Sequence, residues 1–386
     1  MITAISREHY DASDQVSYQS TAHAGLDESV IRLISQKNHD PDWMLELRLQ
    51  AFSRLQTIAF PSWGPSLEKL DLNDIIFFWQ AEGWSNAKNW DAVPEKIKNT
   101  FERLGIPEAE RTILAGVWAQ YDSEVVYHSL KQELQDKWVI FEDISVAIRN
   151  HESLVREYFA RAVGMNDHYF ATLHYAVWSG GTFLFIPQWV KLEEPLQAYF
   201  RMNMKSLGQF EHTIIVCEAQ SEAHYIEGCS APKYGNSSLH AGCVEVFVKP
   251  DAKMRYSSVE NWSSDTFNLN TKRAIVAERG FMEWIWGNLG SGVTMLYPCS
   301  ILKGDDSVAH HLSLAFAAEG QDTDTGAKVI HVGKRTRSEI ISKSLSKSGI
   351  STTRILSHIL PTAEDAVSHI QCDGLLLDEW AKSDTE

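Results

Sequence analysis

The sequence lacks the cysteine patterns that mark disulfide or zinc frameworks. It has five cysteines in 386 residues, and no two of them stand in a CxxC spacing. An odd, sparse set of cysteines in a long chain argues against a disulfide framework, and the missing CxxC argues against a zinc knuckle or a thioredoxin-type site. A reducing compartment fits such thiols, so we expect a cytoplasmic protein with some reactive cysteines.

Long apolar runs and a basic surface are also missing. No stretch approaches the roughly 20 continuous apolar residues needed to cross a bilayer. The first residues carry acids early and resemble neither a signal peptide nor a transit peptide. Lys and Arg number 35 against 51 Asp and Glu, and the net charge of −16 argues against nucleic-acid binding. Because phosphate loops, GxSxG motifs and paired catalytic carboxylates are missing too, we do not expect a self-contained enzyme.

The first 165 residues show mainly helical periodicity. Asp27 is placed to cap one helix, and Pro41 suits the first position of another. Residues 141–163 predict one or two further helices. A long helix is predicted over residues 107–134 because apolar side chains recur there every three or four positions, at Leu114, Val117, Trp118, Tyr121 and Val125.

From residue 166 the period becomes two, in short runs separated by Gly, Asn, Asp and Pro. A long series of short strands without intervening helices excludes a doubly wound sheet and leaves a sandwich, a barrel or a β-solenoid. Paired strands that recur every 20–25 residues or so favour a β-helix slightly over a sandwich. We therefore expect an α+β protein with a helical region at 1–165 and a β-helix at 166–386.

Two cysteines stand in contexts that suit an accessible thiol. Cys229 follows the strand-like HYIE and a glycine and precedes Ala-Pro, which predicts a thiol just past a strand end. Cys372 follows an alternating stretch and precedes Asp and Gly. The usual state of a free cysteine is a small buried hydrophobe, and we expect that inert state for Cys217, Cys243 and Cys299.

Polar residues near strand ends are the next candidates. Arg201 and Asn203 lie in LQAYFRMN, Lys272 lies in NTKRA, and SVENWSS contains Glu260 and Trp262. A cation near a thiol stabilises the thiolate, which is both the nucleophile and the metal ligand. Surface ion pairing and a packed turn are the ordinary alternatives. No histidine pair has the HExxH ligand spacing, so we expect structural or solvated roles for His240, His310, His311 and His331.

Long, ordered motifs resemble one family. WSGGTFLFIPQWVKLEEPLQAYFRMN, LGQFEHTIIV, YIEGCSAPKY, SSLHAGCVEV, ENWSSDTFNLNTKR, GNLGSGVTMLYP and LSLAFAAEGQDTDTGAKVIH follow one another as they do in SufB proteins. PDWMLELRL, LGIPEAER and QYDSEVVYH, nearer the N-terminus, match as well. From about residue 25 to its end, the chain thus resembles SufB, within the SufB/SufD family of iron–sulfur cluster assembly scaffold proteins.

The resemblance implies a right-handed parallel β-helix and an assembly scaffold, not an enzyme. It implies a SufD-like paralogue, a SufC-like ATPase and a SufE- or SufU-like sulfur donor as partners. The resemblance implies a transient iron–sulfur cluster as the cofactor. It also allows reduced flavin in the complex. Cys229 matches the cysteine that accepts persulfide sulfur, and Cys372 matches the metal-holding cysteine of the assembly site. The residues that match the sulfur route through the β-helix are Arg201, Asn203, Glu260, Trp262 and Lys272.

The sequence departs from the family pattern where charges change. Gln, Arg, Asp and Lys of the family are replaced, in that order, by Glu260, His212, Trp286 and Gly292. The chain also stops at Glu386, where the family continues with further strands, a His-Glu pair and a SufC-docking segment, so we expect a fragment or a shortened paralogue. Two rival interpretations remain open: an interaction-only subunit that has lost the chemical site, and an unrelated β-helix acting on polysaccharide.

Overall fold

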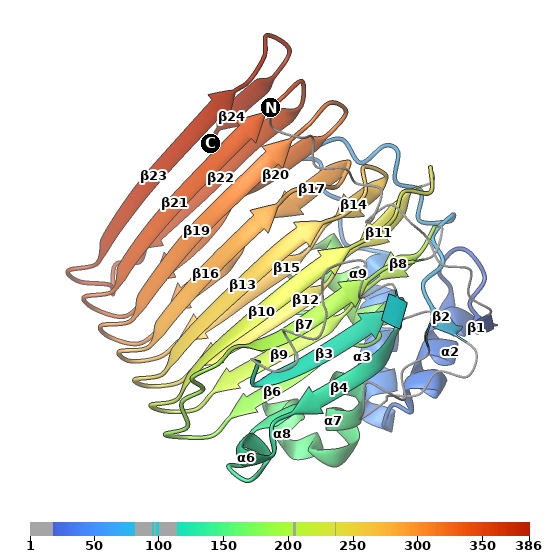
Figure 1. Cartoon of the computed structure of the whole chain (residues 1–386), viewed down its shortest axis with the longest axis horizontal. Helices are drawn as coiled ribbons and strands as arrows, with labels where there is room; N and C mark the ends of the chain where they lie inside the picture. The colour runs from blue at the N-terminus through green and yellow to red at the C-terminus, as the bar shows by residue number, and fades with distance from the viewer. Residues whose placement is uncertain (1–17, 82–94, 96–97, 100–113, 204–205, 236) are drawn as a thin grey trace.

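The computed structural model describes residues 18–81, 95, 98–99, 114–203, 206–235 and 237–386. Figure 1 shows strands stacked side by side through most of the molecule, with the C-terminal strands at one end of the stack. Within the solenoid the strands pair in parallel, coil upon coil. The predicted α+β class, with a few N-terminal helices followed by a β-solenoid, is confirmed.

One long sheet forms the first wall of the solenoid. Its order along the stack is β23-β21-β19-β16-β13-β10-β7-β3-β4. In chain order its strands are β3 (Gly116–Tyr121), β4 (Glu124–Leu130), β7 (Leu196–Arg201), β10 (Glu222–Ser230), β13 (Lys253–Asn261), β16 (Phe281–Asn288), β19 (Val308–Ala317), β21 (Arg337–Ser346) and β23 (Val367–Leu376).

A second sheet forms the facing wall and has two arms that meet at β20. One arm and the strands that follow it are β5 (Ile140–Asp143), β6 (Thr182–Ile186), β9 (His212–Cys217), β12 (Cys243–Val248), β15 (Thr271–Val276), β18 (Cys299–Leu302), β20 (Asp322–His331), β22 (Ile350–Ile359) and β24 (Lys382–Thr385). The other arm consists of β8 (Gly208–Gln209), β11 (Ser238–His240), β14 (Thr266–Asn268) and β17 (Val293–Leu296).

Each coil is longer than the sequence predicted. Paired residues in adjacent strands are 26 positions apart at Arg273 and Cys299 and 32 apart at Ile350 and Lys382. The expected repeat of roughly 20–25 residues was too short because it counted strands and neglected the turns between them. These turns recur with the coil, and each uses one residue at positive φ, at Asp251, Arg279, Asp306, Arg335 and Asp365.

Two apolar cores lie on either side of the second sheet. One fills the solenoid between the two walls and includes Leu196, Tyr225 and Trp284. The other lies between the outer face of the second sheet and the N-terminal helices. Strands β9 and β12 are buried on both faces as a result, which explains why their sequences are largely apolar on both faces.

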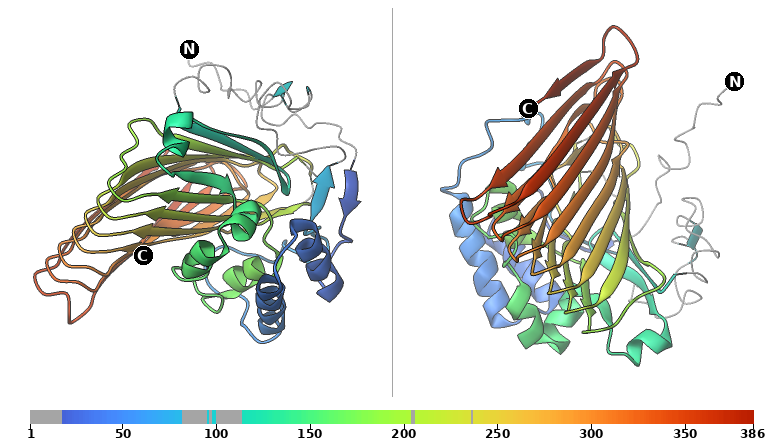
Figure 2. Two further views of the ribbon diagram at one scale, coloured as in Figure 1. Left: turned by 90° about the horizontal axis from the view of Figure 1, so that it is seen from below. Right: turned by 90° about the vertical axis from the view of Figure 1, so that its left-hand side faces the viewer.

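Most of the helices gather on one side of the solenoid (Figure 2). They are α2 (Glu28–Asn38), α3 (Asp42–Leu55), α7 (Ile144–Asn150), α8 (Glu152–Tyr158) and α9 (Tyr169–Val177). The short α6 (Gln132–Gln135) lies apart from them, next to the end of β4. Asp27 caps α2 as predicted, by accepting a hydrogen bond from Val30 N. Pro41 occupies the N-cap of α3, one position before the predicted one. Helices α7 and α8 confirm the prediction for 141–163, whereas α9 was missed. A small separate sheet pairs β1 (Tyr18–Thr21) with β2 (Trp79–Ala81).

The predicted long helix over 107–134 is wrong in its described part. Residues 107–113 lie outside the described residues, and those that follow form the antiparallel hairpin β3–β4. The hairpin turns at Asp122, which adopts a φ of 56°. Valines and aromatic residues prefer strands, and β3 pairs in parallel with β7, so the tertiary pairing prevails over an apolar spacing that also fits a helix.

The hairpin and β5 belong to the two walls although they precede residue 166. A boundary at residue 165 separates these strands from the walls that they join, and the division into regions 1–165 and 166–386 stays a prediction. Among the described residues, none of the helices is long and apolar enough to cross a membrane.

Candidate functional site

Cys229 lies inside the solenoid, next to the last residue of β10. Its register neighbours are Phe200 on one side and Glu260 on the other, and its side chain is 2% exposed. The prediction of a thiol beyond a strand end was wrong, because β10 continues through Ser230. Gly228 permits this: a Cβ there would lie 2.7 Å from the ring of Tyr199, so only glycine fits the close approach.

Lys272 connects the two walls beside this cysteine. From β15 its Nζ donates to Glu227 Oε1 at 2.8 Å and to Glu260 Oε1 at 3.0 Å, both on the facing sheet. All three side chains are buried. Burial alone would lower the pKa of Lys272, but the two carboxylates raise it well above its ordinary value. Burial would raise the pKa of Glu260, but the Lys272 charge lowers it. Lys272 and Glu260 therefore stabilise each other's charged forms, and Glu227 accepts a hydrogen bond from the same ammonium.

A histidine–glutamate pair extends the ionic cluster. His240 Nε2 lies 2.6 Å from Glu211 Oε1, and its Nδ1 lies 3.0 Å from Asn268 Oδ1. Burial would lower the pKa of His240, but the Glu211 charge and its hydrogen bond raise it. Asn268 also donates to Glu260, which links the pair to the lysine. Trp262 covers the imidazole, with ring centroids 4.2 Å apart.

The cluster disfavours a thiolate at Cys229. Burial, followed by the charges of Glu227, Glu260 and Glu211, raises the pKa of the Cys229 thiol well above its usual range, and Lys272 offsets this only in part. Lys272 lowers this pKa, as expected of a nearby cation, but burial and the three carboxylates outweigh it. Burial also raises the pKa of the Cys217 thiol, to about 12, and that of Cys243, as expected for inert cysteines in apolar strands.

Arg201 and Asn203 lie at the rim of this cluster. Arg201 ends β7, and its Nη1 donates to Ser230 Oγ at 3.0 Å, one residue beyond Cys229. Asn203 is held through its backbone: its N–H donates to Asp122 Oδ1 at 2.6 Å, and its carbonyl accepts from Tyr234. The structure thus brings Arg201 beside Ser230, next to Cys229, while Asn203 lies beyond the end of β7, against the turn of the β3–β4 hairpin.

Cys372 lies far from Cys229 but on the same wall. It is on β23, half-buried, with Sγ 3.8 Å from Thr385 Oγ1. Strand register places it at the end of one inward-facing column, which we call the interior column: Glu227, Ser258, Trp286, Ser313, Ser342 and Cys372. The first five are buried. Five inter-strand steps of about 4.8 Å each put the two cysteine strands about 24 Å apart.

Sequence reasoning missed Glu227, Glu211 and the role of His240. Strand alternation carried a signal for the first, because residues two apart on β10 share a face and Glu227 precedes Cys229 by two. No such signal exists for Glu211 or His240: His240 ends β11 on the other arm of the second sheet, and Glu211 lies in the corner between β8 and β9. His310 and His311 do point to opposite faces as expected, with His311 buried.

Comparison with known proteins points to one family. Residues 200–386 match the family model described as the SufBD core domain of SUF-system iron–sulfur cluster assembly. A protein of Staphylococcus epidermidis named iron–sulfur cluster assembly SufBD family protein is 48% identical over 362 residues, which cover 94% of this chain and 78% of the relative. Similarly named proteins of Staphylococcus saprophyticus and Staphylococcus aureus are 46% and 47% identical with the same coverage.

Proposed function

The chain belongs to the iron–sulfur cluster assembly SufBD family, and from that premise we propose that it is a SufB-like scaffold that accepts sulfur at Cys229 and helps to build clusters at Cys372. The cluster is cargo that the scaffold passes on. The proposed partners are a SufD-like paralogue, a SufE- or SufU-like sulfur donor, and a SufC-like ATPase that hydrolyses ATP. The family description names no flavin, so flavin stays a prediction.

Sulfur would enter by thiol exchange. The Cys229 thiolate attacks the outer sulfur of the donor's persulfide, a new S–S bond forms on Cys229, and the donor leaves as a thiolate. The reaction needs no oxidant, because the sulfane sulfur only changes its attachment. Lys272 is the cation placed to stabilise anionic sulfur there, while the carboxylates keep the resting thiol protonated. Transfer therefore requires an opened conformation in which a docked donor reaches the buried Cys229.

The observation that carries the proposal is the interior column. It joins the strand of Cys229 to Cys372 along the inner face of one wall, and hydroxyl groups line its later part: Ser313 donates to Ser342 at 2.9 Å, and Cys372 follows in register. Cys372 is also the most exposed of the five cysteines. Because thiolates are the preferred ligands of cluster iron, a half-buried cysteine in register with a row of hydroxyl groups suits an assembly site.

A second candidate function has its own support. Trp286 occupies the interior column between Ser258 and Ser313, and its ring packs edge-on against His311 at 6.0 Å between centroids. A buried indole obstructs a polar route, and Glu260 adds negative charge beside Cys229. Both features favour a subunit that keeps the fold and the partner contacts but has lost the chemistry.

Assays of sulfur transfer and of cluster reconstitution distinguish the scaffold function from the interaction-only function. With a persulfide-loaded donor, we expect labelled sulfur on the wild type and on the control Cys217→Ser, and none on Cys229→Ser. Anaerobic reconstitution with iron and sulfide should give cluster absorbance that falls in Cys372→Ser. If both cysteine variants behave like the parent, the interaction-only function replaces the scaffold chemistry. If Trp286→Ser increases cluster yield severalfold, the indole is an obstruction.

A further inference from the structure

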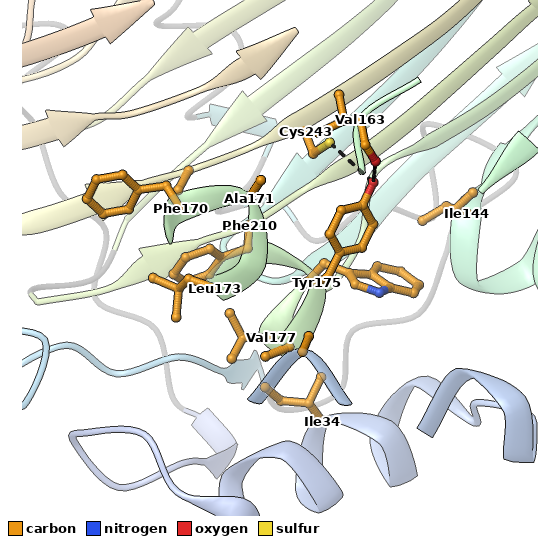
Figure 3. Close-up of a cluster of buried hydrophobic side chains, with 14 of the residues drawn as sticks. Ile34, Ile144, Val163, Phe170, Ala171, Leu173, Tyr175, Val177, Phe210 and Cys243 are labelled. Carbon is orange, nitrogen blue, oxygen red and sulfur yellow. Dashed lines mark hydrogen bonds between the residues drawn. The ribbon is translucent and has the colours of Figure 1, made fainter. Parts of the chain in front are cut away.

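Outside the sulfur site, two histidines and a cysteine meet in the core beneath the helices. His174 comes from α9, and His212 and Cys243 are register neighbours on β9 and β12. One ligand atom from each lies within 4.8 Å of the other two. All three side chains are buried, and none belongs to the ionic cluster around Lys272. Figure 3 shows Cys243 next to Tyr175 in this core.

One hydrogen bond fixes the tautomer of His174. Its Nδ1 lies 2.9 Å from the carbonyl oxygen of Ala241, which can only accept, so this nitrogen carries a hydrogen and Nε2 carries the lone pair. The tautomer of His212 is not fixed in the same way. Its Nε2 lies 3.2 Å from Glu245 Oε1 but makes no hydrogen bond, and the Glu245 carboxylate accepts backbone N–H groups from Ala160, Ala162 and Val163.

The lone pair of His174 Nε2 points at the second imidazole. His174 Nε2 and His212 Nδ1 are 2.9 Å apart. The positive centre between them is either the proton of a His212 Nδ1–H group or a metal ion that both nitrogens bind. The hydrogen bond from His174 Nδ1 to Ala241 matches that of metal-ligating histidines, which donate their second N–H to a carboxylate or a backbone carbonyl.

We propose that His174, His212 and Cys243 form a buried structural site for a thiophilic transition-metal ion such as Zn²⁺ or Fe²⁺. Imidazole and thiolate are the donors that these ions prefer, and neither suits Mg²⁺ or Ca²⁺. Tetrahedral bonds of zinc length separate two ligand nitrogens by about 3.3 Å, so the rings need to part by only a few tenths of an ångström. The dication is balanced by the Cys243 thiolate and the Glu245 carboxylate.

The surroundings suit an ion that holds the fold together. Phe159 stacks on His212 with centroids 4.3 Å apart, and Trp178 and Tyr175 lie 5.9 and 5.6 Å from the same ring. Three protein donors leave a fourth tetrahedral position, and this buried aromatic shell keeps a substrate from reaching it. The ion would join α9 to β9 and β12, and thus the helical layer to the solenoid.

The test uses the full chain with Cys372→Ser as the background, so that cluster iron does not contribute. Refolding with Co²⁺ and removal of excess metal should leave about one ion per chain and a thiolate-to-cobalt charge-transfer band. Cys243→Ser should lose the band and hold less than about 0.1 ion per chain, whereas the control Cys217→Ser should keep both. Zinc content of protein grown in zinc-supplemented medium should follow the same order.

Two further variants keep the outcome decisive if Cys243→Ser does not fold. A variant in which Cys243 is the sole cysteine should retain the cobalt band, which then has no other thiolate source. His212→Arg supplies a fixed cation beside Glu245 and should fold without metal. The proposal is overturned if the background protein takes up no Co²⁺ or Zn²⁺, because the positive centre is then a proton, or if Cys243→Ser and Cys217→Ser bind the metal equally.

Discussion

The interior of the solenoid has a charged section and a neutral section. In the coils of β10, β13 and β15, polar groups are ionised and paired, with Lys272 between Glu227 and Glu260. In the later coils of β19 and β21, buried polar groups are neutral, as in the hydrogen bond between Ser313 and Ser342. A buried charge is stable only beside an opposite charge, whereas a buried hydroxyl needs only a hydrogen-bond acceptor. Removing one partner should therefore lower the free energy of unfolding more in the charged section than in the neutral section.

The largest effect is expected from removing the central cation of the charged section. Lys272→Met leaves the carboxylates of Glu227 and Glu260 buried without their counterion, and should lower the free energy of unfolding by about 3–5 kcal/mol. Urea unfolding measures it. The control Lys343→Met breaks an exposed pair with Asp373 and should unfold close to the wild type. If both variants lose the same free energy of unfolding, the buried ion pairs of the charged section contribute no more to stability than an exposed pair does.

Acid should act on the neutral section through His311. Burial lowers the pKa of His311 to about 3, from an ordinary value of 6.5. Between pH 6.5 and about pH 3, His311 therefore binds a proton in the unfolded chain but not in the folded chain. The free energy of unfolding decreases as the pH falls through this range. At pH 4.5 the loss is about 2–3 kcal/mol.

His311→Gln isolates this contribution from the carboxylates that titrate in the same range. We expect its free energy of unfolding to fall less between pH 7 and pH 4.5 than that of the wild type, by the same 2–3 kcal/mol or so. Parallel acid profiles for the two proteins would show that His311 is not held neutral.

Glu260→Gln sharpens the comparison at Cys229. Removing one of the carboxylates that raise the Cys229 pKa lowers that pKa and increases the thiolate fraction. Alkylation of Cys229 should accelerate by up to about tenfold for each pKa unit gained. Mass spectrometry gives the rate relative to Cys217 in the same molecule. In the wild type Cys372 should react first, because Cys229 and Cys217 are both buried; a faster Cys229 would contradict the structure.

The smallest effect is expected from a single hydroxyl in the neutral section. Ser342→Ala removes the acceptor of the Ser313 hydroxyl and should reduce stability by about 1 kcal/mol. Thermal unfolding measures it. A loss comparable to that of Lys272→Met would erase the distinction between the two sections.

Strand alternation predicted much of this architecture, and the failures have physical causes. In β16 the alternation places Met282, Trp284 and Trp286 on one face, and the structure buries that face. It failed at β3, where one apolar spacing fits both a helix and a hairpin, and pairing with β7 decides.

For the candidate site, the resemblance supplied Cys229 and Lys272 but not their setting. The pKa of Cys229 depends on Glu211, which comes from the corner between β8 and β9, earlier in the chain than β10. The His174, His212 and Cys243 cluster was missed for the same reason, because a helix and two strands far apart in the chain meet only after folding.

The regular coil has a consequence for how the gene can change. Deleting one residue inside a strand reverses the facing of every later side chain in that strand, and would expose Trp284 or bury Glu283 on β16. Adding or removing a whole coil of 26–32 residues keeps both parallel ladders in register. The length of such a protein can therefore change by duplication or loss of entire coils, while single-residue insertions should survive only in the turns, where Asp251 and its counterparts already tolerate a left-handed backbone.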